Sequence, residues 1–177
     1  MRASVSISIV LLALACMPLC AQRNKRDPLT EAQVDKIREA GIYPDGRIKL
    51  YTEFVAEHVE TIRALTARRA SAARAKRLED ELLDLTALMD ELGTNLDMYQ
   101  DRKADIRKSL GALHEAAPKW LETLHALPTE PGFELSLKES IESAQDLSDQ
   151  AAQLLKEQTA YFEAHKDERG QERYEPR

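Results

Sequence analysis

The residue spacing that comes closest to a metal site is Glu122-Thr-Leu-His125, in the second half of the chain. Di-iron helical bundles use this Glu-x-x-His pattern because residues three apart project toward the same side of a helix. Such a site needs the motif twice and two further carboxylates, whereas this sequence has one copy. His114 shares the helix face but lies about 16 Å away, and His58 and His165 could approach only through tertiary packing. We therefore predict no metal site and no cofactor, with Glu122 and His125 as weak candidates.

Motifs of catalysis are also missing from the sequence. The chain has no glycine-rich phosphate loop, no Gly-x-Ser-x-Gly, no His-Glu-x-x-His and no Cys-x-x-Cys-His for haem attachment. Paired carboxylates such as Asp80 and Glu81 project from adjacent helix faces, and nothing in their pattern indicates the desolvation that general acid catalysis requires. We predict that the protein is not an enzyme and assign no catalytic residue.

The charge pattern restricts function more than any motif does. Between Thr61 and Leu78 the chain carries basic residues and no acidic one, and from Glu79 to Asp101 it carries acidic residues and no basic one. The basic residues, called the basic segment below, are Arg63, Arg68, Arg69, Arg74, Lys76 and Arg77. We interpret them as a surface for an anionic partner, such as lipid, a cell-wall polymer or an acidic protein. The alternative is a solvated helical hairpin with ion pairs worth about 0 to 1 kcal/mol each.

The overall charge excludes one class of partner. The formal net charge is −6 at pH 7, and an acidic chain is not suited to binding the phosphate backbone of nucleic acids. We expect a protein partner or self-association, weak contact with an anionic envelope surface, and membrane contact only through a cleaved signal segment.

The N-terminus has the pattern of a secretory signal peptide. Arg2 precedes an apolar run at residues 5–15 that is too short to span a bilayer comfortably, and Ala21 is the small residue that signal peptidase requires. We predict cleavage after Ala21 and export to the periplasm or outside the cell. The alternatives are an uncleaved anchor and a lipoprotein modified at Cys16. Cleavage after Ala21 removes both Cys16 and Cys20, so the mature chain would have no disulfide.

Helix signals recur along the rest of the chain. Thr30-Glu-Ala-Gln33 is a capping box that predicts a helix ending at Gly41, and Pro44 suits the first position of the next helix. That second helix has apolar residues three and four apart, at Ile48, Tyr51, Val55, Val59, Ile62 and Leu65. A second capping box, Ser136-Leu-Lys-Glu139, predicts the start of the last helix.

An apolar heptad pattern, called the heptad stripe below, extends over residues 78–127 with Lys103 as its one polar member. It consists of Leu78, Leu82, Leu85, Met89, Leu92, Leu96, Tyr99, Lys103, Ile106, Leu110, Leu113, Ala117, Trp120, Leu124 and Leu127. A period of about 3.5 residues predicts coiled-coil packing. Pro118 disfavours one straight helix. Because the stripe keeps its phase, we expect a kink between Asp101 and Pro118 in preference to a full reversal.

These patterns together predict an all-α fold. We expect an elongated antiparallel helical bundle of three to four long helices with coiled-coil heptad packing. The predicted organisation is a signal peptide at residues 1–21, a flexible lead at 22–29, the bundle domain at 30–165 and a disordered charged tail at 166–177. The heptad stripe could be covered within this chain or by a second one.

The segment Leu29-Thr-Glu-Ala-Gln33, followed by Ile37-Arg38, resembles the Leu-Thr-x-x-Gln motif of Spy/CpxP-type periplasmic chaperones and stress sensors. Those proteins are exported, small and all-helical, so the resemblance implies a periplasmic chaperone or stress-response protein. It covers this segment alone, and the second copy of the motif that the family carries is missing. From the residues themselves we predict an exported, non-enzymatic structural or protein-interaction module of the cell envelope, with the chaperone as the alternative and a metal-binding bundle third.

Overall fold

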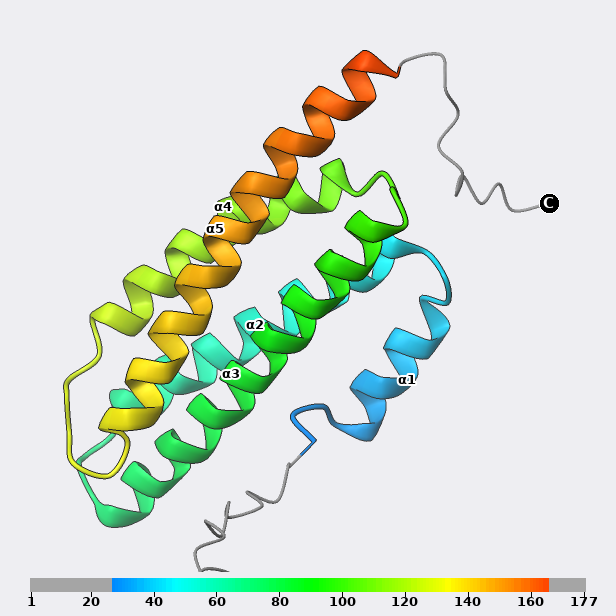
Figure 1. The fold of residues 1–177 in the computed structure, drawn as a ribbon. Coiled ribbons are helices and arrows are strands. Elements are labelled where there is room, and N and C mark those ends of the chain that lie inside the picture. The colour runs from blue at the N-terminus through cyan, green and yellow to red at the C-terminus, as the bar shows by residue number, and fades with distance from the viewer. Residues whose placement is uncertain (1–26, 166–177) are drawn as a thin grey trace, which may run out of the picture.

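The computed structural model describes residues 27–165, which fold into five α-helices without strands (Figure 1). The helices are α1 (Glu31–Glu39), α2 (Pro44–Thr66), α3 (Ala72–Asp101), α4 (Arg107–His125) and α5 (Glu134–Ala164). The predicted all-α class is confirmed for this part of the chain. None of the five helices combines the length and hydropathy of a membrane-spanning segment. The predicted signal peptide (1–21), most of the predicted lead (22–26) and the predicted tail (166–177) lie outside the described residues.

Local capping chemistry sets the limits of α1 and the start of α2. The Thr30 hydroxyl accepts a hydrogen bond from the backbone N–H of Gln33, and the Gln33 side chain accepts one from that of Thr30, so the predicted capping box is confirmed. Gly41 follows the end of α1 with φ +61°, a conformation in which a side chain would be strained. Pro44 lies in the first turn of α2, where a backbone N–H has no partner within the helix.

The four longer helices surround one apolar core in a bundle-like arrangement. α2 and α5 each pack against both α3 and α4. α1 packs against α2 alone and buries a single side chain, Ile37. All the apolar positions predicted for α2 are buried, and so is the heptad stripe apart from Lys103 and the half-buried Leu127. The heptad stripe is therefore covered within one chain.

The predicted kink between Asp101 and Pro118 is wrong, because the chain reverses there. α3 ends at Asp101, Lys103 takes the left-handed conformation with φ +54°, and α4 runs back along the molecule (Figure 1). Lys103 is exposed in the turn, so the reversal costs no apolar contact at that position. Pro118 instead lies inside α4, on its exposed side. The spacing of the heptad stripe continues across the turn because α3 and α4 each bury apolar residues three and four positions apart.

A buried glutamine of α5 holds this turn in place. Gln158 is 3% exposed, and its side-chain oxygen accepts a hydrogen bond from the backbone N–H of Ile106 at 3.1 Å. Its amide group donates to the backbone oxygen of Ala104 at 3.1 Å and to the side chain of Gln100 at 3.3 Å. Since Ala104 and Ile106 are themselves buried, Gln158 takes the place of the water that an exposed turn would use.

The start of α4 depends on α2 in a similar way. Ile106 occupies the N-cap position of α4 and offers no side-chain hydrogen bond. Asp45, in the first turn of α2, accepts hydrogen bonds from the backbone N–H of Ser109, at 3.3 Å, and from the Ser109 hydroxyl. A carboxylate from another helix therefore satisfies an N-terminal donor of α4 and lies at the favourable end of its dipole.

The second predicted capping box is wrong. α5 begins at Glu134, earlier than predicted, and the N-cap residue Phe133 makes no side-chain capping bond. Ser136 lies inside the first turn, where it is buried and its backbone oxygen accepts a hydrogen bond from the Ser140 hydroxyl at 2.8 Å. Burial of the Phe133 ring in the core, directly after the left-handed Gly132, places the start of the helix instead.

Candidate functional site

The two weak metal candidates lie near the end of α4 and are exposed. No group of three or more His, Cys, Asp or Glu side chains among residues 27–165 is placed to hold a metal ion around Glu122 and His125 or elsewhere. The other histidines do not join them: His58 Nδ1 lies 2.9 Å from Glu81 Oε2, and His165 stacks on an aromatic ring of α5. Tertiary packing therefore brings no further ligand to this pair within the described residues.

Two members of the basic segment are engaged in ion pairs on their own helices. The Arg63 guanidinium lies 2.6 Å from Glu60, and the Lys76 ammonium lies 3.0 Å from Asp80 and 3.1 Å from Glu79. Hydrogen bonds to Asp80 and Glu79 raise the pKa of Lys76. Exposed pairs of this kind contribute little to stability, but they leave less positive charge to attract a partner.

Arg74 does not belong to the predicted anionic-partner surface, because it is 6% exposed. Its guanidinium pairs with Glu130 of the α4–α5 loop (residues 126–133). It also donates to the backbone oxygens of Thr66, at 3.2 Å, and Arg68, at 3.4 Å, at the end of α2. These carbonyls lack helical partners and lie at the negative end of the helix dipole, so a cation is favourable there. Arg74 therefore ties together the end of α2, the start of α3 and the α4–α5 loop.

Three exposed arginines complete the basic segment. Arg68 and Arg69 lie in the α2–α3 loop (residues 67–71), and Arg77 lies in the second turn of α3. Within residues 27–165 no ion pair involves any of the three. Short, exposed side chains lie on both sides of Arg68 and Arg69: Ala67, Ala70, Ser71, Ala72 and Ala73. These three guanidinium groups are the part of the basic segment that can reach a partner.

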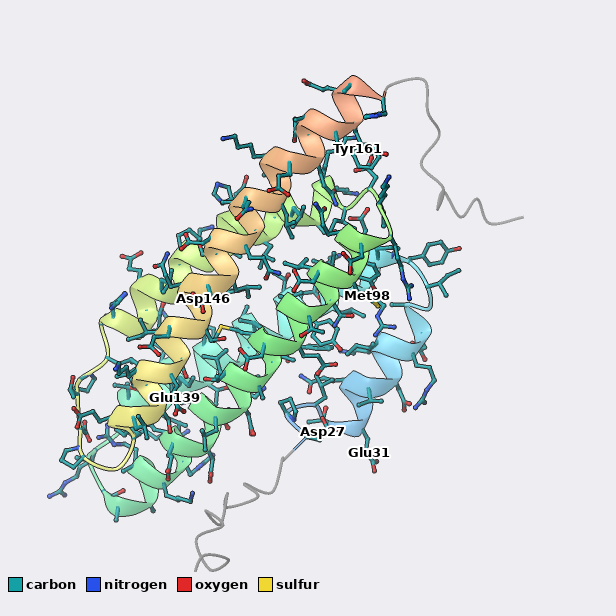
Figure 2. The ribbon with its side chains drawn as sticks, viewed as in Figure 1. Asp27, Glu31, Met98, Glu139, Asp146 and Tyr161 are labelled. Carbon is teal, nitrogen blue, oxygen red and sulfur yellow. The ribbon has the colours of Figure 1, made fainter. Side chains whose placement is uncertain are left out.

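A cleft of about 340 Å³ lies between the start of α1 and the helices α2 and α3. Asp27, at the point where the chain enters α1 in Figure 2, lines it together with Glu57 and the His58–Glu81 pair. Its polar groups bind one another: the Gln33 amide donates to Glu57 at 3.2 Å, and Asp27 accepts from a neighbouring backbone N–H. The cleft is acidic, but these carboxylates and the imidazole already have partners.

A second cleft, of about 300 Å³, lies near the end of α5, where Figure 2 places Tyr161. Tyr161 and Phe162 pack edge to face with ring centroids 5.1 Å apart, and the Lys103 ammonium lies 5.6 Å from the Tyr161 ring. The lining amides of Gln100 and Gln158 are hydrogen-bonded to each other. They therefore give the cleft little specificity for a polar ligand.

The segment that resembles the periplasmic chaperones has a local structural role, because Thr30 and Gln33 cap α1. Comparisons of the chain with protein-family models, with curated proteins and with solved structures find no match.

Sequence reasoning missed two residues that bear on the basic segment. Glu130, the partner of Arg74, lies 56 residues away in a loop, and no periodic pattern connects the two. Leu135 is exposed in the first turn of α5. Leu135 lies outside the apolar spacing of that helix, and this could have indicated its exposure from the sequence.

Proposed function

We propose that this protein is an exported, non-enzymatic interaction module of the cell envelope that binds an anionic partner through Arg68, Arg69 and Arg77. The observation that carries the proposal is the exposure of these three guanidinium groups without ion pairs in the described part of the chain. Arg74 supports it by holding the loop between them. Export rests on the signal-peptide pattern at residues 1–21.

The helices in this proposal serve as a scaffold. We propose that α2, α3, α4 and α5 form an elongated antiparallel bundle with coiled-coil packing at the heptad positions. Because the heptad stripe is buried against the chain's own helices, it has no free face for a second chain. The loops and exposed side chains are then the surfaces through which a partner, or a second copy, would bind.

The two alternatives have less support from the described contacts. The periplasmic chaperone rests on Thr30 and Gln33, which the capping of α1 already explains. The metal-binding bundle rests on Glu122 and His125, which are exposed and without further ligands among the described residues. Neither alternative has an observation of its own comparable to the three arginines.

The test is binding of the purified protein to fluorescein-labelled poly-L-glutamate, followed by fluorescence anisotropy at low and at raised salt. We expect salt-sensitive binding, and we expect the double variant Arg68→Gln/Arg69→Gln to weaken it about tenfold, at up to about 1 kcal/mol for each ion pair. The matched control Lys108→Gln/Lys156→Gln removes the same charge from exposed positions of α4 and α5. Absence of binding, or equal losses in both double variants, would contradict the proposal.

A further inference from the structure

Two loops distant in the sequence form one end of the molecule. Arg74, in the first turn of α3, pairs with Glu130 of the α4–α5 loop. A Cβ atom on Gly132 would lie 3.5 Å from the Cβ of Ala75, so the two segments are in contact. Figure 1 shows the α2–α3 and α4–α5 loops side by side at the same end of the long helices. We call this surface, with the first two turns of α3 and the first turn of α5, the basic end.

The basic end combines exposed cations with an exposed apolar side chain. Its cations are Arg68, Arg69 and Arg77, described above. Leu135, in the first turn of α5, is 66% exposed and so has most of its surface in water. A surface that presents both arginine and leucine outward matches the boundary of a phospholipid bilayer, which offers phosphate groups above an apolar interior.

Arginine suits this partner for a chemical reason. The planar guanidinium donates two parallel hydrogen bonds to phosphate oxygens, which a lysine ammonium cannot do. Short alanine side chains flank Arg68 and Arg69 and leave them free to reach a flat surface. The two clefts described above lie beside α1 and near the end of α5, and no residue of the basic end lines either of them. A broad surface therefore fits the basic end better than an acidic peptide, which would need a groove.

The acidic charge of the rest of the protein does not prevent such binding. α3 is 30 residues long, or about 45 Å at 1.5 Å per residue, whereas charges are screened over about 10 Å at moderate salt. Next to Arg77, Glu79 and Asp80 are paired with Lys76, and in the α4–α5 loop Glu130 is paired with Arg74. Glu134 is exposed beside Leu135 and opposes an anionic surface. Removing the Glu134 charge should therefore strengthen binding.

We propose that the basic end docks end-on against an anionic phospholipid bilayer, with the three arginines on lipid phosphates and Leu135 at the edge of the apolar layer. This inference rests on the proposed function and specifies its partner. Because Arg74 fixes the two loops before binding, little conformational freedom is lost on docking.

The experiment is co-sedimentation of the full-length protein with vesicles of equal parts phosphatidylglycerol and phosphatidylcholine, and with vesicles of phosphatidylcholine alone. We expect binding to the first and none to the second. Arg68→Gln/Arg69→Gln should lower the partition coefficient about 25-fold, at about fivefold per basic residue. The control Lys108→Gln/Lys156→Gln should change it less than about twofold. Circular dichroism of each variant verifies its folding.

Two further variants test the position of the surface. Leu135→Ser should weaken vesicle binding. Glu134→Gln changes an exposed side chain outside the core and should strengthen vesicle binding about fivefold. Equal binding to both kinds of vesicle, or no effect of the Arg68/Arg69 substitution, would overturn the inference. Binding to polyglutamate without binding to vesicles would point to an acidic protein and overturn the lipid inference alone. Failure to bind polyglutamate would end the proposed function, on which this inference rests.

Discussion

Replacement of Gln158 by leucine tests how the α3–α4 turn is held. Leucine is apolar and of roughly similar size, but it cannot bond to the backbone N–H of Ile106 or the backbone oxygen of Ala104. Each buried polar group left without a partner costs about 1 to 3 kcal/mol. Burial of the apolar leucine side chain adds about 1 kcal/mol to the free energy of unfolding. We therefore expect the free energy of unfolding to fall by about 1 to 5 kcal/mol, a large part of the roughly 5 to 15 kcal/mol typical of a domain.

The assay is urea unfolding followed by circular dichroism, with the free energy and its dependence on urea fitted together. Gln145→Leu is the matched control, because Gln145 is an exposed glutamine of the same helix with one side-chain bond to Asp149 at 3.1 Å. Its effect should stay within about 0.5 kcal/mol. If Gln158→Leu also stays within that limit, the turn does not depend on this side chain and the reasoning is refuted.

Three further substitutions probe the ion pair, a buried tyrosine and the first helix. Arg74→Met should lower the free energy of unfolding by about 3 kcal/mol because it leaves the partly buried Glu130 without its partner. The control is Arg77→Met, which changes an exposed arginine of the same helix, and an equal loss in both variants in the urea assay would contradict this prediction. Burial raises the pKa of Tyr51, so the unfolded chain loses the phenolic proton first and stability should fall as pH rises above about 10. Tyr51→Phe should flatten that fall, and an unchanged slope would count against the assignment. Thr30→Ala should speed hydrogen exchange in α1 about fivefold, the effect of a cap worth about 1 kcal/mol, and equal acceleration in α3 would show that α1 does not open separately.

Local interactions account for the parts of the fold that were predicted correctly. The capping box of α1 and the place of Pro44 involve residues three or fewer positions apart. The apolar positions of α2 follow from helical periodicity, which is also local. The second capping box failed although it has the same local pattern, because burial of Phe133 outweighed the bond that Ser136 would have made.

The candidate site was predicted only in part. The sequence identified all the basic residues, yet it could not separate Arg74 from Arg77, which lie three positions apart and differ in what packs over them. The acidic partner that distinguishes Arg74 is Glu130 of the α4–α5 loop, 56 residues later in the sequence. Leu135 is part of the basic end only because the fold brings the α4–α5 loop and the α2–α3 loop to the same end of the molecule.

By itself the sequence determined the helical content, the period of the buried stripes and the charge reversal along the chain, because these depend on residue type and on neighbours within a helical turn or two. The tertiary structure decided that the chain reverses at residues 102–106, that the heptad stripe is covered internally, and which arginines remain free. Those outcomes depend on contacts such as Gln158 with Ile106 and Arg74 with Glu130, which join residues 52 and 56 positions apart. The apolar periodicity is compatible with more than one path of the chain, and only the bonds made across the core select among them.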